Sequence, residues 1–278
     1  MKILVLGATG MLGHQLVKSL KPKHDVWGLG RAEFEAWEVD NAKLSFGQFD
    51  VVVNCIGIVK QRQSTPEEMI EVNALFPHRL ARVCREVNTR LIHLSTDCVF
   101  SGRAGNYNEH SKPDPDDLYG RTKLLGEVQN EGCLTIRTSI IGRELNRQQG
   151  LVEWLLRAPS PVRGFVNHLF TGVTTIEMTR IVDRIITHYP TASGLWHVGG
   201  DPINKYALLW MLARHYGLKT EIQYDTSTAC DRTLDSRRFR HEFAYKPPSW
   251  ASMIAELAKE CPLEPGRQPP EVEFMMGL

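Results

Sequence analysis

The stretch Gly7-Ala8-Thr9-Gly10-Met11-Leu12-Gly13 separates an apolar run, Lys2–Leu6, from Met11–Leu20, where apolar residues recur at helical spacing. This order predicts a β-strand, a glycine turn and an α-helix. Glycine is needed where a backbone turns tightly or touches a phosphate, and the first N–H groups of a helix attract anions. The position of the stretch therefore favours a dinucleotide-binding turn over an ordinary turn between strand and helix.

Strands and helices continue to alternate through the N-terminal half of the chain. Each expected strand is almost continuously apolar, which is typical of a parallel sheet covered on both faces. The expected strands after the first are Asp25–Leu29, Trp37–Asp40, Asp50–Cys55, Leu91–Ser95 and Cys133–Thr138, and the expected helices are Pro66–Val87 and Tyr119–Val128. We therefore predict an α/β fold with a Rossmann-type, doubly wound parallel sheet.

The pattern changes after Gly142. Helical periodicity then recurs in three segments around one strand-like run. The helical segments are Leu151–Leu156, Thr175–Ile186 and Tyr206–Tyr216, and the strand-like run is Gly194–Val198. We predict an NAD(P)-binding domain at residues 1–142, which later segments help to complete, and an interleaved, smaller and mainly helical substrate-binding lobe at residues 143–261. Four prolines and weak periodicity predict an irregular tail at residues 262–278.

The composition excludes several classes of protein. The chain has 278 residues, of which 42% are apolar and 23% charged, as in an ordinary soluble globular protein. The formal net charge is +1 and the basic residues are dispersed, so we expect no nucleic-acid partner. No apolar run reaches the ~18 residues of a membrane span, and no signal peptide follows Met1, so we expect a cytoplasmic protein without a membrane partner.

The cysteines indicate free thiols in a reducing compartment. They include no C-x-x-C pair, and several lie in apolar runs that predict strands. They are Cys55, Cys84, Cys98, Cys133, Cys230 and Cys261. No group of His, Cys and Asp has metal-ligand spacing, so we expect no catalytic metal.

A hydroxyl, a phenol and an ammonium form the expected catalytic group. Tyr119 and Lys123 are four residues apart on a predicted helix, so their side chains share one face. The ammonium is expected to lower the phenol pKa from about 10 and to hold the ribose of a cofactor. Thr96, with Ser95 beside it, follows a strand and can bond a substrate oxygen. Thr96 could simply be a packing residue, and Tyr119 and Lys123 could have this spacing on a solvated helix. The glycine turn, the hydroxyl and the Tyr–Lys pair follow one another along the chain, and this combination favours carbonyl reduction.

Three further stretches are expected to contact the cofactor. Arg31 ends the second expected strand, where NAD sites usually carry an acid, so it suits the 2′-phosphate of NADPH. A solvated surface arginine would leave NADH as the alternative. Glu38-Val39-Asp40 is expected beside the adenine, with either carboxylate as the contact. Cys55-Ile56-Gly57 is expected along the adenosine and its ribose.

The sequence also resembles the extended short-chain dehydrogenase/reductases, and within them the dTDP-4-dehydrorhamnose reductase family. The resemblance spans nearly the whole chain. It is carried by GATGMLG at Gly7–Gly13, STDCVFSG at Ser95–Gly102, YGRTK at Tyr119–Lys123, RTSIIG at Arg137–Gly142, GLWHV at Gly194–Val198, NKY at Asn204–Tyr206 and RTLDS at Arg232–Ser236. It implies that NADPH reduces the C4 ketone of a nucleotide-activated 4-keto-6-deoxy sugar, with Tyr119 as proton donor and Thr96 beside it.

The resemblance implies further contacts. Asn73 would support Lys123 through the backbone and water, unless it is an ordinary helix residue. Thr138 and Ser139 would pack along the nicotinamide and substrate. Lys205 and Arg232 match positions that hold the nucleotide diphosphate, although surface salt bridges would also explain these cations. His197 is expected to be structural, on a strand.

Two departures from the family pattern bear on the reaction. Lys60 belongs to a loop facing the sugar, Gly57-Ile58-Val59-Lys60-Gln61, that differs from the rhamnose-pathway pattern. An N-acetylated or UDP-linked 4-keto sugar is therefore an alternative to a dTDP-linked one. Cys98 follows Asp97 where sugar-nucleotide dehydratases have a second acid, which argues against dehydration.

Three alternatives remain open. Epimerases of this fold share the tyrosine and lysine. A non-catalytic, NADP-binding regulatory subunit is a different class of function, but the retention of Thr96, Tyr119 and Lys123 together favours catalysis. The sequence also leaves a homodimer open as the oligomeric state.

Overall fold

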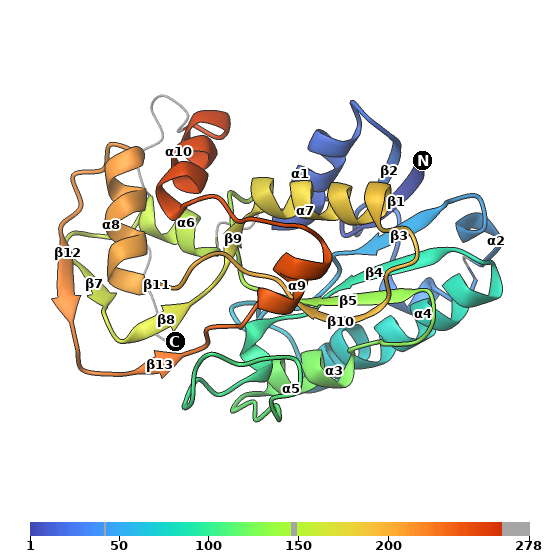
Figure 1. The fold of residues 1–278 in the computed structure, drawn as a ribbon, viewed down its shortest axis with the longest axis horizontal. Helices are drawn as coiled ribbons and strands as arrows, with labels where there is room; N and C mark the ends of the chain where they lie inside the picture. The colour runs from blue at the N-terminus through green and yellow to red at the C-terminus, as the bar shows by residue number, and fades with distance from the viewer. Residues whose placement is uncertain (42, 146–148, 263–278) are drawn as a thin grey trace.

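A computed structural model describes residues 1–41, 43–145 and 149–262. Its main feature is a six-stranded parallel sheet with the strand order β10-β5-β4-β3-β1-β2. In chain order, the strands are β1 (Lys2–Leu6), β2 (Asp25–Leu29), β3 (Val51–Asn54), β4 (Arg90–Leu94), β5 (Cys133–Arg137) and β10 (Gly194–His197). The predicted doubly wound α/β fold is confirmed, because helices cover both faces of this sheet (Figure 1).

The two faces of the sheet have separate apolar cores. On one face, α1 (Met11–Leu20) lies beside α7 (Thr175–His188), as Figure 1 shows above the sheet. On the other face, α4 (Phe76–Glu86) packs together with the short α2 (Lys43–Phe46). Strand residues are buried on both faces, as in β3, all of whose residues are buried. This explains why the strands are continuously apolar rather than alternating.

The predicted strand Trp37–Asp40 is wrong. The segment forms a 3-10 turn, η1 (Ala36–Glu38), whose ends are held by reciprocal bonds between Glu35 and Glu38. Val39 is fully buried beneath the turn. Apolar residues here anchor a turn, and their short run imitates a strand.

The predicted long helix Pro66–Val87 is interrupted. It consists of α3 (Pro66–Ile70), a π segment η2 (Glu71–Leu75) and α4. Pro77 has no N–H to donate to the Asn73 carbonyl, so the regular ladder cannot continue through this position. Gly126, directly after α5 (Leu118–Leu125), packs against the Asn73 carbonyl. The approach is so close that a Cβ on Gly126 would overlap the carbonyl oxygen.

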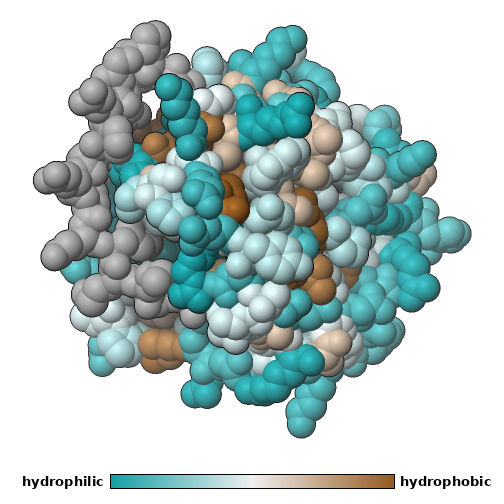
Figure 2. Space-filling view, turned by 90° about the vertical axis from the view of Figure 1, so that its left-hand side faces the viewer, coloured by the Kyte–Doolittle hydropathy of each residue, from teal (hydrophilic) through white to brown (hydrophobic). Residues whose placement is uncertain are grey.

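The second lobe contains strands as well as helices. Two segments after residue 142, α7 and β10, complete the first domain, because α7 packs on α1 and β10 pairs with β5. The lobe's remaining elements are α6 (Leu151–Leu155), β7 (Val162–Phe165), β8 (His168–Phe170), β11 (Ile203–Asn204), α8 (Lys205–His215), β12 (Ile222–Asp225), β13 (Cys230–Asp231) and α10 (Trp250–Glu260). Its outer surface is mostly hydrophilic, with small apolar areas (Figure 2).

Four short elements remain, and one apolar core joins the two parts of the molecule. They are η3 (Asp97–Val99), the paired strands β6 (Ile140–Ile141) and β9 (Val173–Thr174), and α9 (Arg237–Glu242). One apolar core runs from the sheet into the lobe and includes Ile3, Val173 and Leu208. The two parts therefore form one packed body. The predicted tail at 262–278 lies almost wholly outside the described residues.

Candidate active site

A cavity of about 760 Å³ lies where β1, β3, β4 and β5 end. Ligand sites of open α/β sheets form at these carboxyl ends. Sixteen residues proposed from the sequence line it: Gly7, Thr9, Gly10, Met11, Leu12, Arg31, Cys55, Ile56, Gly57, Lys60, Ser95, Thr96, Tyr119, Lys123, Thr138 and Ser139. The structure thus brings the glycine turn and the expected catalytic group to one cavity.

The glycine positions of the turn leave little room for a side chain. Gly7 has a φ of 79°, which disfavours other residues. A Cβ on Gly13 would overlap the Gly7 carbonyl, so Gly13 packs behind the turn rather than lining the cavity. Gly10 is the N-cap of α1, and the first helical turn has no acidic residue. Backbone N–H groups at this end therefore suit the pyrophosphate of a dinucleotide.

Arg31 lines the cavity but is already paired. Its Nε donates to Glu35 Oε1 over 2.8 Å, and this bond raises the pKa of Arg31. The charge of Glu68, on α3, also raises the pKa of Arg31. A 2′-phosphate at Arg31 would therefore meet two neighbouring carboxylates.

The expected adenine contacts need correction. None of Glu38, Val39 and Asp40 lines the cavity: Glu38 accepts from the Glu35 N–H, Val39 is buried, and Asp40 pairs with Arg82. The turn places other residues there, namely Phe34, Glu35, Ala36 and Trp37. The Trp37 side chain stands out because 54% of its surface is exposed. These residues have no recognisable motif, because the short apolar run beside them imitates a strand.

Asn73 holds the loop that follows β3. Its Oδ1 accepts from the Ile58 N–H at 2.8 Å, and its Nδ2 donates to the Ile58 carbonyl at 2.9 Å. A third bond, from Nδ2 to Thr122 Oγ1, ties this loop to α5. Asn73 is fully buried, outside the cavity lining, and acts through the backbone.

Thr96 and Tyr119 meet at the centre of the cavity wall. Asp117 caps α5, accepting the Gly120 N–H at 2.7 Å, and so fixes the turn that carries Tyr119. Thr96 Oγ1 accepts from the Cys98 N–H. Burial raises the pKa of Tyr119, and a hydrogen bond with Thr96 opposes the rise. The phenol is thus protonated at neutral pH and can serve as a proton donor.

Lys123 does not act as expected on the phenol. Its Nζ donates to the Leu94 carbonyl over 2.7 Å, and burial lowers the pKa of Lys123 to about 8. The lowered pKa of Tyr119 expected from this ammonium is not seen, because burial outweighs other effects on the phenol. Lys123 therefore faces the backbone end of β4.

The second-lobe cations gather around Cys98. Arg232 donates from Nε to the Phe100 carbonyl at 2.9 Å, and its other terminus lies 3.6 Å from Cys98 Sγ. Lys205 and Lys60 also act electrostatically on Cys98. Only Lys60 and Cys98 among these line the cavity, so Lys205 and Arg232 stand behind Cys98.

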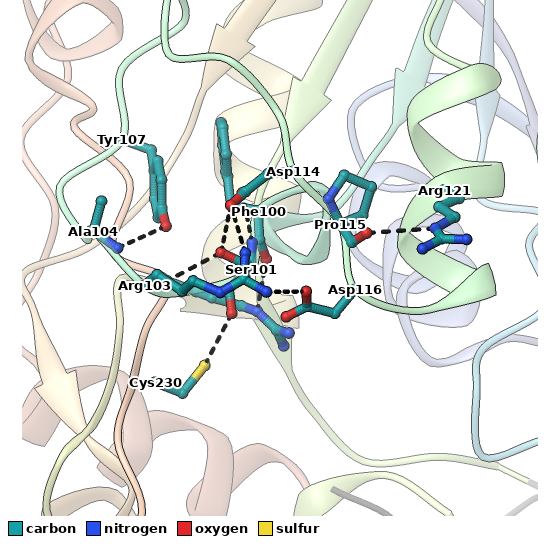
Figure 3. A network of polar contacts seen from close by, with 11 residues as sticks. Phe100, Ser101, Arg103, Ala104, Tyr107, Asp114, Pro115, Asp116, Arg121 and Cys230 are labelled. Atoms are coloured by element: carbon teal, nitrogen blue, oxygen red, sulfur yellow. Dashed lines mark hydrogen bonds and ion pairs between the residues drawn. The ribbon is translucent and has the colours of Figure 1, made fainter.

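A polar network fixes the loop between Thr96 and α5 (Figure 3). Asp114 accepts from both the N–H and the hydroxyl of Ser101, at 2.9 and 2.6 Å. Arg103 bridges Asp114 and Asp116. The same loop reaches the second lobe, where Cys230 contacts the Ser101 carbonyl. Residues from both lobes thus set the position of the turn that carries Thr96.

The family matched by the sequence is the RmlD substrate binding domain, over residues 1–262. The chain belongs to this family. The match covers both lobes and confirms the resemblance read from the motifs. None of the described helices is long and apolar enough to cross a membrane. Within the same described residues, no group of three His, Cys, Asp or Glu is arranged to hold a metal ion.

Three relatives show how the family varies. The Bacillus subtilis spore coat polysaccharide biosynthesis protein SpsK is 25% identical over 93% of this chain and 97% of its own. The Mycolicibacterium smegmatis dTDP-4-dehydrorhamnose reductase is 36% identical, but the match covers only 45% of this chain and 40% of that protein. The Xenopus laevis methionine adenosyltransferase 2 subunit beta is 34% identical over 78% of this chain and 72% of its own.

Two solved structures share the fold. One is the dTDP-4-dehydrorhamnose reductase of Bacillus anthracis in complex with NADP, with a TM-score of 0.82 and 19% identity over 94% of this chain and 99% of that chain. The other is an ortholog from Clostridium acetobutylicum, with a TM-score of 0.82 and 22% identity over 95% and 100%. At these identities the likeness establishes the Rossmann-type fold.

Proposed function

We propose that this protein is an NADPH-dependent reductase of the C4 ketone of a nucleotide-activated 4-keto-6-deoxy sugar, linked to dTDP or UDP. One observation carries the proposal: Thr96, Tyr119 and Lys123 line the same cavity as the glycine turn. The family and its sugar-nucleotide reductases support the substrate class. The free thiols of the six cysteines suit a cytoplasmic enzyme.

The cofactor supplies a hydride to the ketone carbon, and the protein supplies the proton. Tyr119 donates its phenolic proton to the oxygen that develops negative charge. Thr96 hydrogen-bonds the same oxygen and orients it toward Tyr119. Lys123, whose Nζ is fixed by the Leu94 carbonyl, would hold the nicotinamide ribose. The raised pKa of Tyr119 keeps the acid loaded until the alkoxide forms.

Cofactor binding uses the backbone of the glycine turn for the pyrophosphate and Arg31 for the 2′-phosphate. The complex of the Bacillus anthracis reductase with NADP supports NADPH as the cofactor. Because Arg31 is paired with Glu35, the phosphate must compete for its guanidinium. NADH therefore remains a usable second cofactor.

The substrate lies against Lys60 and Cys98, with Lys205 and Arg232 providing positive charge for the diphosphate. Cys98 cannot take the place of the second acid of a dehydratase. Burial and Asp97 raise the pKa of its thiol to about 12, so the thiol is neutral. Simple reduction is therefore favoured over dehydration.

A second function is suggested by one relative. The Xenopus laevis protein is, by name, a subunit of a different enzyme. Under this alternative the chain would bind NADPH without turning it over. The presence of Thr96, Tyr119 and Lys123 in one cavity favours catalysis.

A substrate panel separates these functions. The protein is incubated with NADPH and dTDP- or UDP-linked 4-keto-6-deoxy sugars, and the loss of absorbance of NADPH is followed. We expect turnover with at least one sugar and slower turnover with NADH. Tight NADPH binding without turnover of any sugar would favour the regulatory subunit.

A further inference from the structure

A buried ion pair lies directly behind the cavity. Glu127 follows α5, and Arg137 ends β5. Arg137 donates Nε and Nη2 to the two carboxylate oxygens of Glu127, each at 2.8 Å. Only 4% of either side chain is exposed. A bidentate pair so well shielded from water has a fixed geometry.

Glu127 accepts a third bond from the cavity side. The Ser95 hydroxyl donates to Glu127 Oε1 over 2.7 Å. Lys123 donates to the carbonyl of Leu94, the residue next to Ser95. The carboxylate and the ammonium are therefore both fixed to the end of β4. Glu127 is also four residues beyond Lys123 along the chain.

The remaining donor of Arg137 is held by a neutral histidine. His197 Nδ1 lies 2.9 Å from the Tyr107 carbonyl, so this nitrogen carries the proton, and Nε2 accepts from Arg137 Nη1 at 3.2 Å. Burial and Arg137 lower the pKa of His197 to about 4, so the ring stays neutral. The histidine thus keeps Arg137 oriented toward Glu127.

The charge of Lys123 depends on few neighbours. Burial disfavours its ammonium, while Glu127 and, after β3, Cys55 favour it. His93 on β4 is buried near Lys123. Burial and the charge of Lys123 lower the pKa of His93, so its ring is neutral. The Cys55 thiol has a pKa raised to about 12 by burial and is neutral as well. Glu127 is therefore the charged group that stabilises the ammonium.

We propose that Glu127, clamped by Arg137, is a positioning residue that keeps Lys123 charged and fixes the Ser95 hydroxyl at the cavity wall. The inference rests on the proposed function for its kinetic readout. It explains how a buried lysine remains an ammonium at neutral pH. It also gives a role to Arg137 and His197, which do not line the cavity.

The test is Glu127→Gln, which keeps the shape and hydrogen-bonding oxygen but removes the charge. We expect the alkaline limb of kcat/KM to move to lower pH by about one unit, so that turnover at pH 8 falls about fivefold while turnover at pH 6 changes little. Glu131→Gln, at an exposed carboxylate, should leave the profile unchanged. An equal loss at every pH, or an unshifted limb, would overturn the proposal.

Two additions keep the test decisive. Glu127→Gln leaves Arg137 buried without its partner, so the double variant Glu127→Gln/Arg137→Met removes both charges and should restore thermal stability. It should keep the shifted limb. The pH dependence of NADPH binding, followed by fluorescence, should shift in the same direction without needing turnover. An unshifted binding profile in a folded variant refutes the role of Glu127 even if the proposed reaction is wrong.

Discussion

The two ends of the cavity are built in different ways. At the glycine turn, the backbone forms the surface, and close packing of Gly7 and Gly13 fixes it. At the other end, the surface depends on side chains such as Lys60 and Cys98, and Arg232 from the second lobe lies behind Cys98. Backbone recognition tolerates few changes, whereas side chains can be exchanged. Under the proposed function, we therefore expect the sugar end to tolerate substitutions better than the cofactor end.

The catalytic group lies between these ends, and its loss should have the largest effect. Tyr119→Phe should lower turnover about 10²–10⁴-fold, because the proton donor is gone. NADPH affinity should hardly change, since the cofactor end is intact. Steady-state kinetics and a binding titration measure both. Tyr224→Phe, at an exposed tyrosine, is the control. Normal turnover in Tyr119→Phe would remove this residue from the mechanism.

The backbone end is tested by Gly13→Ala. The added Cβ would overlap the Gly7 carbonyl and spread the turn. Overpacking of this kind costs about 1–3 kcal/mol, so NADPH affinity should fall about 5–150-fold. Gly217→Ala, which has open space but a positive φ, should lower stability and spare affinity. Equal NADPH affinity in Gly13→Ala and the wild type would contradict the packing argument.

The side-chain end is tested by Lys205→Met. Under the proposed function, the buried charge of Lys205 attracts the diphosphate from behind Cys98, so its loss should raise KM for the sugar nucleotide about tenfold, with NADPH affinity unchanged. Lys219→Met, at an exposed lysine beyond the C-terminal end of α8, is the matched control. A KM equal to that of the wild type would place the diphosphate elsewhere.

The smallest expected effect concerns the choice of cofactor. Glu35→Gln frees Arg31 from its exposed ion pair, and such pairs contribute about 0.2–1 kcal/mol. NADPH should then bind up to about fivefold more tightly, with NADH unchanged. Arg31→Ala should weaken NADPH more than NADH. Parallel changes for both cofactors would argue against a 2′-phosphate at Arg31.

Local sequence patterns predicted the first domain well. β1, α1 and β2 begin and end at the expected residues, because continuous apolar runs and helical periodicity are local properties. The same logic failed at Ala36–Glu38, where two glutamates close a turn on themselves. It also missed the π segment before Pro77, since that depends on how a helix packs.

The candidate site was predictable only in part. The glycine turn and the expected catalytic group belong to short motifs, so the sequence alone identified them. Their residues line one cavity. The pKa of Tyr119 could not be foreseen, because burial depends on the whole fold. Nor could the pair of Glu127 and Arg137, which joins residues ten positions apart through the sheet. Contacts between distant segments leave no pattern in a single sequence.

The central claim is that NADPH and a sugar ketone bind together in this cavity and that hydride passes from the first to the second. It is tested most directly with NADPH carrying deuterium at both C4 positions and a 4-keto sugar nucleotide turned over by the protein. The product should be heavier by one mass unit than the product made with unlabelled NADPH, with the label at the sugar C4. A product without deuterium, or bound NADPH that is never oxidised, would contradict the account.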